Sequence, residues 1–315
     1  MPLVPGKVGS MVDRTGRKLA NSFLNADNRC LPGVRTTPWS DRSPAAPLGY
    51  PAVGSGSVPI FLNRFRVADQ VAVVTGGGGG IGSAIGAALG EAGARVILAD
   101  VSEEAAVRAA QGLCSRGMVA DARHVDVADE AGVDALFAGI AADFGRIDIV
   151  VNAAGIALRA RAVDHTLENW EKVMRVNATG TFLCCRSAAR HMIPSKRGAI
   201  VNIASIMGVS GGGIYPNVSY HTSKGAVVNL TRTLALEWAC HNIRVNAIAP
   251  TYVRTEFIRP LLAVEELVKR IGAITPLGRL AEPDDVASAA LYLASPAAAM
   301  VTGHILAVDG GFLAQ

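Results

Sequence analysis

The chain has 315 residues, half of them hydrophobic, and its 30 Lys and Arg outnumber its 26 Asp and Glu to give a formal net charge of +4. No run reaches about 18 uninterrupted apolar residues and no signal-peptide core is present, so the sequence predicts neither a membrane span nor secretion. Its five cysteines lack C-x-x-C spacing and its six histidines lack H-E-x-x-H. These patterns argue against a disulfide scaffold and a zinc site, and they favour a cytoplasmic location.

Residues 1–60 differ in composition from the rest of the chain. They are rich in proline, glycine and serine and show no apolar period, which is typical of disordered segments. Residues 1–57 hold seven Lys and Arg but three Asp, so residues 58–315 carry 23 charges of each sign and offer no basic groove for nucleic acid. We expect residues 1–60 to be a disordered or mis-assigned extension, with a transit peptide as the alternative, and residues 61–315 to form one domain.

The folded part begins with a strand that runs into a glycine-rich loop. Residues 70–75 are apolar and β-branched, and an alanine-rich helical stretch follows the loop. A strand, a tight turn and a helix in this order direct backbone N–H groups and the helix dipole at a pyrophosphate, and side chains would block that approach. Two spacings fit this loop, G-x-x-x-G-x-G at Gly76, Gly80 and Gly82 with Ile81 between the last two, and G-x-G-x-x-G at Gly77, Gly79 and Gly82.

The second predicted strand, residues 95–100, ends at Asp100. A carboxylate at this position hydrogen-bonds the adenosine ribose hydroxyls of a dinucleotide and repels the 2′-phosphate of NADP. Neither the glycine loop nor Val101 supplies the cation that a 2′-phosphate would need. The sequence therefore predicts NAD as the cofactor, with NADP less favoured.

Further apolar runs alternate with helical stretches along the rest of the chain. The predicted strands are residues 70–75, 95–100, 118–125, 147–152, 198–204, 243–248 and 304–308. Continuous Val, Ile and Ala runs indicate strands buried on both faces, as in a parallel sheet. We predict an α/β fold with a doubly wound, Rossmann-like parallel sheet of about seven strands in a single domain.

Tyr220 and Lys224 form a Y-x-x-x-K step. Residues four apart on a helix share one face with Cβ atoms about 5–6 Å apart, so the ammonium would lie beside the phenol and lower its pKa. A shift from about 10 to about 7 takes roughly 4 kcal/mol, which one charge at about 4 Å supplies in an effective dielectric of about 20. Tyr220 is therefore a candidate acid/base.

Together, the Gly76, Gly80 and Gly82 spacing, the Asn152-Ala153-Ala154-Gly155 step, Ser205 and the Tyr220-x-x-x-Lys224 step resemble the short-chain dehydrogenase/reductase family over residues 65–315. The resemblance implies that Tyr220 transfers the proton and that Lys224 also holds the nicotinamide ribose. It implies that Ser205 binds the substrate oxygen and that Asn177 completes a proton relay. It also implies a homotetramer. The further cofactor contacts that it implies are Asp126, Val127, Asn152, Ala153, Gly155, Pro250, Val253 and Thr255.

The sequence departs from the family pattern at two places. Thr251 follows Pro250 where the family usually has glycine, which restricts the backbone beside the nicotinamide. Tyr220 follows Ser205 by fifteen positions, about two more than is usual, so residues 211–217 are expected to form an enlarged loop over the substrate. Tyr215 has Ser219 four residues later and cannot replace Tyr220.

The stretch from Tyr215 to Thr255 resembles the polyol and sugar-acid branch of the family, which includes gluconate 5-dehydrogenase. We therefore expect interconversion of a secondary alcohol and a ketone on a polyol, sugar or sugar acid, with a 3-oxoacyl thioester reductase or a hydroxysteroid dehydrogenase as alternatives. Asn217, Tyr215 and Tyr252 are candidate partners for hydroxyl groups, and Arg159 or Arg161 for a carboxylate. Either arginine can equally be a solvated surface residue.

Two other classes of protein fit parts of the sequence. Gly208-Val209-Ser210-Gly211-Gly212 matches the G-x-S-x-G motif of hydrolases, with Asp284 or Asp285 and then His304 after it. That motif needs a sharp turn from strand to helix, whereas Ser210 is predicted to lie in a long loop. A dinucleotide-binding sensor without catalysis is the second class, and the presence of Asn177, Ser205, Tyr220 and Lys224 argues against it.

Overall fold

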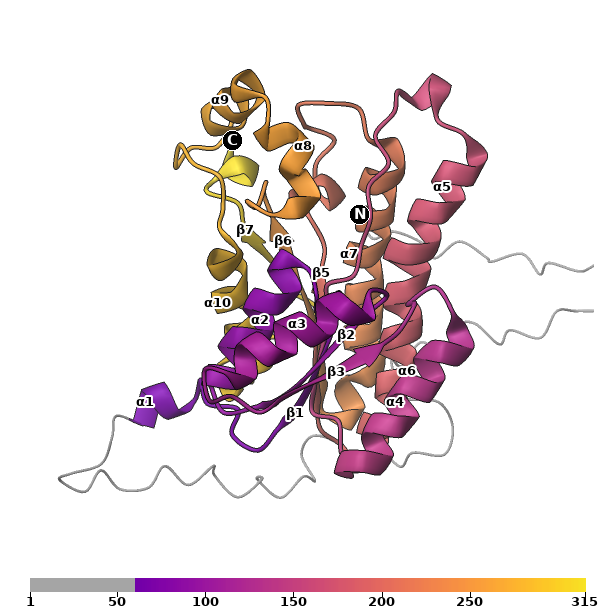
Figure 1. The fold of residues 1–315 in the computed structure, drawn as a ribbon, viewed down its shortest axis with the longest axis vertical. Coiled ribbons are helices and arrows are strands. Elements are labelled where there is room, and N and C mark those ends of the chain that lie inside the picture. The colour runs from indigo at the N-terminus through magenta and orange to yellow at the C-terminus, as the bar shows by residue number, and fades with distance from the viewer. Residues whose placement is uncertain (1–59) are drawn as a thin grey trace, which may run out of the picture. The chain divides into compact units, whose positions relative to one another are not determined.

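The structure is a computed structural model that describes residues 60–315, so the expectation of a disordered extension concerns residues outside the described range. Seven parallel strands form one sheet in the order β3-β2-β1-β4-β5-β6-β7 (Figure 1). Each predicted strand boundary agrees to within two residues, and the doubly wound Rossmann-like sheet is confirmed. The strands are β1 (Val71–Thr75), β2 (Arg95–Asp100), β3 (Ala120–His124), β4 (Ile149–Asn152), β5 (Gly198–Ile203), β6 (Ile243–Pro250) and β7 (Ile305–Val308).

Helices cover both faces of this sheet. The longer ones are α2 (Gly80–Glu91), α3 (Glu103–Cys114), α4 (Glu130–Phe144), α5 (Leu167–Met174), α6 (Thr181–Ser195), α7 (Val218–Trp238), α9 (Glu265–Ala273) and α10 (Pro283–Ala294). Short α-helices are α1 (Ile60–Asn63) and α8 (Arg259–Leu262), and a π-helical turn spans Arg175–Gly180. Single 3₁₀ turns span Ala162–Asp164, Ile206–Gly208, Ala239–His241, Glu256–Ile258, Pro296–Ala298 and Phe312–Ala314. None of the helices in residues 60–315 is long and apolar enough to span a membrane.

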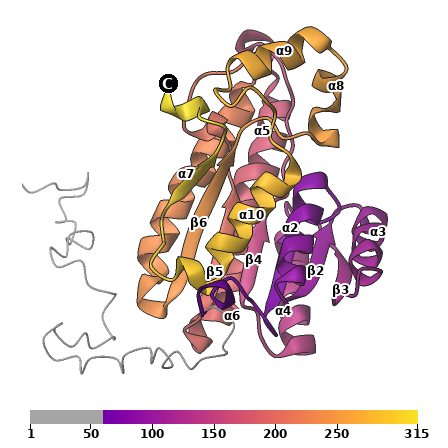
Figure 2. The same cartoon turned by 90° about the vertical axis from the view of Figure 1, so that its left-hand side faces the viewer.

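The alternation of side chains along each strand divides the interior into two hydrophobic cores. Ala72 and Val74 of β1 face α2, α3 and α10, whereas Val71 and Val73 face α4, α6 and α7. Figure 2 shows α2 and α10 side by side over the first face. Every residue of β1, β4 and β5 is buried, as a parallel sheet covered on both faces requires.

The strand order positions the functional site. The chain proceeds outward from β1 through β2 to β3, and then returns to place β4 on the other side of β1. Loops that follow β1 and β4 therefore diverge to opposite faces of the sheet. This reversal leaves a crevice at the carboxyl ends of these strands, where α/β proteins of this kind bind ligands.

A close backbone contact fixes the end of β5 against α7. Ser205 follows β5 and starts the 3₁₀ turn Ile206–Gly208, accepting a hydrogen bond through its hydroxyl from the N–H of Met207 at 3.1 Å. A Cβ at Gly208 would lie 2.6 Å from the carbonyl carbon and oxygen of Lys224. The missing side chain at Gly208 thus lets the turn that carries Ser205 rest directly on the helix that carries Tyr220 and Lys224.

We predict that Gly208→Ala lowers both the thermal unfolding midpoint and kcat/KM, because the added methyl group would push this turn away from α7. Overpacking against atoms that cannot rotate aside costs about 1–3 kcal/mol. Thermal scanning and initial-rate assays measure the two effects.

Gly112→Ala is the matched control, since nothing lies within 4 Å of its Cβ position in α3. It is expected to keep full activity and to gain up to about 1 kcal/mol of stability. Wild-type stability and activity in Gly208→Ala would contradict the role given to this contact.

Candidate active site

A cavity of about 470 Å³ opens at the carboxyl ends of β1, β4, β5 and β6. It joins the glycine loop at one end to the Ser205, Tyr220 and Lys224 group at the other. The predicted site residues on its wall are Gly76, Gly80, Ile81, Gly82, Asp100, Asp126, Val127, Ala153, Gly155, Ser205, Tyr220, Lys224, Pro250, Val253 and Thr255. Residues more than 170 positions apart in sequence thus share one site.

The structure distinguishes between the two glycine spacings. Gly76 has a φ of +67°, and a Cβ there would lie 2.7 Å from the backbone nitrogen of Ala154. A Cβ at Gly82 would lie 2.1 Å from the carbonyl oxygen of Gly76, and one at Gly80 would lie 2.8 Å from the Thr255 side chain. Gly79 has room for a side chain, with its nearest neighbour at 3.4 Å. A Cβ at Gly77 would also be crowded, 2.8 Å from Leu98 Cβ. The packing therefore requires glycine at every position of the G-x-x-x-G-x-G spacing, but not at every position of G-x-G-x-x-G.

The glycine end of the cavity fits the diphosphate and the adenosine ribose of a dinucleotide. No side chain caps the start of α2, so its first N–H groups and its dipole remain available to an anion. Asp100 lies beside the loop and accepts hydrogen bonds from the N–H groups of Gly78 and Ser102, each at 3.0 Å. These contacts hold the carboxylate at the cavity wall, where it can also accept hydrogen bonds from ribose hydroxyl groups.

Tyr220 and Lys224 lie one turn apart on α7, as predicted, but their pKa values differ from the expectation. Burial raises the pKa of Tyr220 to about 12, and a hydrogen bond with Ser205 offsets this only in part. The Nζ atom of Lys224 donates to the carbonyl oxygen of Ile203 at 2.6 Å and lies 5.7 Å from the centre of the Tyr220 ring. Burial also lowers the pKa of Lys224 to about 8. The prediction that the lysine lowers the tyrosine pKa is therefore wrong for this structure.

Two predicted site residues do not line the cavity. Asn152 ends β4 with its side chain inside the protein, where its Nδ2 atom donates to Asn202 Oδ1 at 2.8 Å and to Cys185 Sγ at 3.2 Å. The Asn152 side chain therefore does not line the cavity, because these partners hold it within the sheet.

Asn177 is fully buried in the π-helical turn behind the cavity. Its Oδ1 atom accepts from the N–H of Ile156 at 2.8 Å, and its Nδ2 atom donates to the carbonyl oxygen of Ile156 and to Ser223 Oγ. A Cβ at Gly155 would lie 3.3 Å from Asn177 Oδ1 and 3.6 Å from Lys224 Nζ. Asn177 therefore adjoins the lysine through Gly155 and supports the strand end beside it.

Several wall residues were not predicted from the sequence. Ile156, Met207, Phe257 and Ile258 supply an apolar surface to the substrate end. Ile258 belongs to an apolar cluster that continues into α8 and α9. Their proximity depends on how the segment after β6 folds back, which no short motif encodes.

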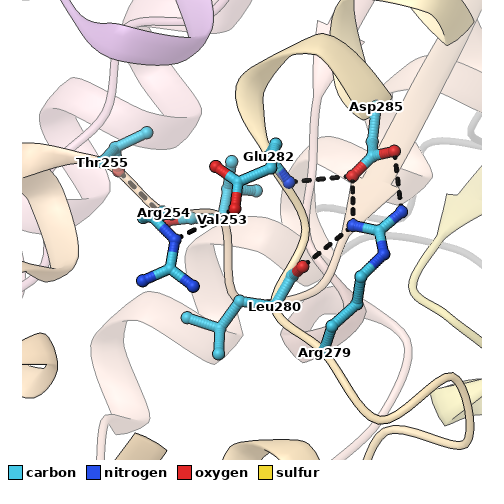
Figure 3. Close-up of polar contacts among 7 residues, drawn as sticks. All are labelled: Val253, Arg254, Thr255, Arg279, Leu280, Glu282 and Asp285. Carbon is cyan, nitrogen blue, oxygen red and sulfur yellow. Dashed lines mark hydrogen bonds and ion pairs between the residues drawn. The ribbon is translucent and has the colours of Figure 1, made fainter.

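The segment after β6, which lines the cavity, forms several contacts with the start of α10 and the residues just before it (Figure 3). Val253 pairs with Ala281 in a parallel bridge, and the Nε atom of Arg254 contacts Glu282 at 2.9 Å. Asp285 accepts from the Glu282 N–H at 2.8 Å and from two nitrogens of Arg279, as Figure 3 shows. Val253 and Thr255 are thereby held at the cavity wall.

The hydrolase alternative fails on geometry. Ser210 lies in a loop between the turn Ile206–Gly208 and α7, so no sharp turn from strand to helix presents it. Its hydroxyl accepts from the Gly212 N–H at 2.9 Å, and Asp285 is engaged by Arg279.

Comparison with known proteins identifies the family. A family model described as enoyl-(acyl carrier protein) reductase matches residues 76–313. A galactitol 2-dehydrogenase from Rhizobium johnstonii is 45% identical over 254 residues, covering 80% of this chain and 98% of the relative. The chain belongs to the short-chain dehydrogenase/reductase family.

Two further members of this family are informative. A cis-4-hydroxycyclohexanecarboxylate dehydrogenase from Sinomonas cyclohexanicum is 44% identical over 249 residues, covering 78% of this chain and 98% of the relative. The crystal structure of a gluconate 5-dehydrogenase from Burkholderia cenocepacia, in complex with NADP and tartrate, is 37% identical with a TM-score of 0.77. It covers 81% of this chain and 99% of that chain.

Membership of the short-chain dehydrogenase/reductase family confirms that this protein is an oxidoreductase that acts on CH–OH groups with a nicotinamide dinucleotide. The sensor without catalysis is thereby excluded. The predicted preference for NAD over NADP does not follow from membership of the family, because the Burkholderia relative was crystallised with NADP.

We predict that the free energy of unfolding changes with pH because Lys224 is buried. Its pKa is about 8 in the folded protein against an ordinary 10.5, so between these values the unfolded chain binds more protons than the folded one. Wild type should therefore gain up to about 3 kcal/mol relative to Lys224→Met as the pH rises from about 8 to about 10.5. Unfolding in urea at several pH values measures this difference.

Lys269→Met is the control, because Lys269 is exposed on α9. It should show no comparable change with pH. A constant stability difference between wild type and Lys224→Met from pH 7 to 10.5 would contradict the lowered pKa of the buried lysine.

Proposed function

We propose that this protein interconverts a secondary alcohol and a ketone on a polyol, sugar or sugar acid, with NAD as the cofactor. The observation that carries the proposal is the continuity of one cavity from the glycine loop to Ser205, Tyr220 and Lys224. A dinucleotide that lies along this cavity would bring its reactive end to Ser205, Tyr220 and Lys224, which together can hold and deprotonate a hydroxyl group. The names of the relatives support the substrate class, since they include a galactitol dehydrogenase and a gluconate 5-dehydrogenase.

The residues of the wall have distinct roles in this proposal. In oxidation the substrate C–H bond breaks with both electrons, the O–H bond gives up its proton, and the carbon becomes a carbonyl. The nicotinamide, when bound, supplies the carbon atom that accepts the hydride. Tyr220 takes the hydroxyl proton as general base, and Ser205, whose side chain acts to lower the pKa of Tyr220, holds the substrate oxygen. In reduction the neutral phenol, which burial favours, donates its proton to the carbonyl oxygen.

Lys224 and Asn177 complete the arrangement. Lys224 would bind the nicotinamide ribose, and its bond to the Ile203 carbonyl fixes the direction from which it approaches. Asn177, through its contacts with Ile156 and Ser223, would keep the strand end and α7 at the separation that the lysine needs. A proton relay from Tyr220 through Lys224 and Asn177 to solvent is consistent with their adjacency at Gly155.

Two further features belong to the proposal. A homotetramer is supported by apolar side chains on the surface of α6 and α7, among them Phe182 and Leu236, the latter 82% exposed. A cytoplasmic location agrees with the buried thiols of Cys184 and Cys185.

The apolar wall at Met207, Phe257 and Ile258 suits a thioester or a steroid as well, so these substrates belong in any activity screen.

We predict that Tyr220→Phe lowers kcat by about 10²–10⁴-fold while NAD still binds, because the proton acceptor is lost but the glycine loop and Asp100 remain. Steady-state rates and calorimetric titration with NAD measure the two properties. Tyr292→Phe, outside the cavity on α10, is the control and should keep wild-type rates. A Tyr220→Phe variant that retains more than about a tenth of kcat would rule out this acid/base.

We also predict that wild type uses NAD with a higher kcat/KM than NADP, and that Asp100→Ser reduces this preference by about tenfold or more. A tenfold change corresponds to about 1.4 kcal/mol, which is a modest value for the repulsion between a carboxylate and a 2′-phosphate. Glu104→Ser, in the first turn of α3, is the control for loss of a nearby negative charge. A wild type that prefers NADP would refute the role of Asp100.

A further inference from the structure

Arg159 is a cation on the cavity wall without an anionic partner. It lies in the loop between β4 and α5, and its guanidinium carbon is 5.0 Å from the centre of the Tyr215 ring. Its Nε atom is buried without a hydrogen-bond partner, and the ion pairs within residues 60–315 do not include this side chain. Arg161, two residues later, is exposed and does not line the cavity.

The ring beneath Arg159 belongs to a packed pair of aromatic side chains. Tyr215 packs edge-on against Tyr252, with ring centres 6.4 Å apart and planes at 70°. Tyr252 is 6% exposed, and its hydroxyl accepts a hydrogen bond from the Ile214 N–H at 3.2 Å. Tyr215 therefore contacts the arginine directly, and Tyr252 supports Tyr215 from the side. Stacking on Tyr215 engages the face of the guanidinium and leaves its N–H edge for a planar anion.

The charge of Arg159 reaches the reacting end of the cavity. Burial raises the pKa of both Tyr220 and Tyr252 to about 12, and the positive charge of Arg159 acts in the opposite direction on each. The acidic residues of the wall do not neutralise it. Asp100 and Asp126 belong to the glycine end, and Glu256 pairs with Arg259 at 3.1 Å.

Two neutral polar atoms on the same wall are also buried without partners, Asn217 Oδ1 and Thr251 Oγ1. An amide oxygen can only accept hydrogen bonds, so it suits a hydroxyl group and repels a carboxylate. A hydroxyl such as that of Thr251 can donate or accept. The wall thus offers one site for a single negative charge and two for hydroxyl groups.

We propose that Arg159 binds a carboxylate of the substrate, so that the enzyme acts on hydroxy acids in preference to uncharged polyols. This inference rests on the proposed function and narrows its substrate class. A guanidinium stacked on an aromatic ring pairs with a planar carboxylate through two parallel hydrogen bonds. Asn217 and Thr251 then accept and orient further hydroxyl groups of the same molecule.

The experiment compares acids with neutral analogues of the same carbon skeleton. D-Gluconate is paired with D-glucitol, D-galactonate with galactitol, and 4-hydroxycyclohexanecarboxylate with its carboxamide, all with saturating NAD. Wild type is expected to favour the acid of at least one pair by about tenfold or more in kcat/KM. Arg159→Gln should lose about 100-fold on that acid and change little on its neutral analogue, because a charge-assisted pair is lost.

Three controls distinguish the loss of a carboxylate contact from a change in the packing of the protein. Arg161→Gln should match wild type on both members of each pair. Arg159→Lys, which keeps the charge but not the planar fork, should recover part of the loss on the acid. Near-ultraviolet circular dichroism of Arg159→Gln tests whether Tyr215 and Tyr252 remain packed, and a change in the ratio of acid to neutral substrate is not expected from mispacking alone.

The outcomes distinguish this inference from the proposed function. Equal or better turnover of the alditols by wild type, or an equal loss on both members of a pair in Arg159→Gln, overturns the carboxylate site and leaves the polyol activity standing. Turnover confined to the cyclohexane acid and dependent on Arg159 supports the carboxylate site and overturns the polyol and sugar substrates. A lack of turnover on all six compounds overturns both.

Discussion

At three places around the cavity, two backbone segments approach each other so closely that a side chain would not fit between them. Gly76 lies against Ala154 at the end of β4, Gly82 lies over Gly76, and Gly208 lies on Lys224 of α7. Backbone atoms cannot rotate aside as a long side chain can, so these contacts fix the distances between the glycine loop, two strand ends and one helix. The cavity owes its shape to these contacts, and both the cofactor end and the reacting end depend on them.

The sheet could be predicted because each strand is a continuous apolar run in the sequence. The predicted strand ends agree with the structure to within two residues. Asn152 could not be placed in the same way. It lies at the end of a strand in a motif that suggests a cofactor contact, yet it pairs in register with Asn202 of β5 and bonds to it. The register between two strands 50 residues apart depends on the packing of both sheet faces, which a local motif does not contain.

The ionisation of Tyr220 and Lys224 shows a second limit of prediction from the sequence. Their spacing correctly predicts that they lie one turn apart on a helix. It does not reveal that Lys224 is buried and Tyr220 partly buried, and this burial raises the pKa of the phenol while it lowers that of the amine. One physical cause, the poor solvation of charge in this cavity, therefore favours the neutral form of both groups. The same low polarity strengthens the effect of any charge that a ligand brings beside them.

Reaction and recognition are assigned to different parts of the fold. Ser205 follows β5, and Tyr220 and Lys224 lie on α7, where the contact at Gly208 holds the two segments together. Arg159 lies in the loop after β4, and Tyr215 lies in the loop before α7. Relatives of nearly equal identity, 45% and 44%, are named for a neutral polyol and for a hydroxy acid. Overall identity therefore does not decide the charge of the substrate. An arginine held on a tyrosine at the cavity wall bears on that choice directly, because its charge favours the binding of an anion, whereas it acts on Tyr220 only at a distance, by opposing the rise in the pKa of the phenol.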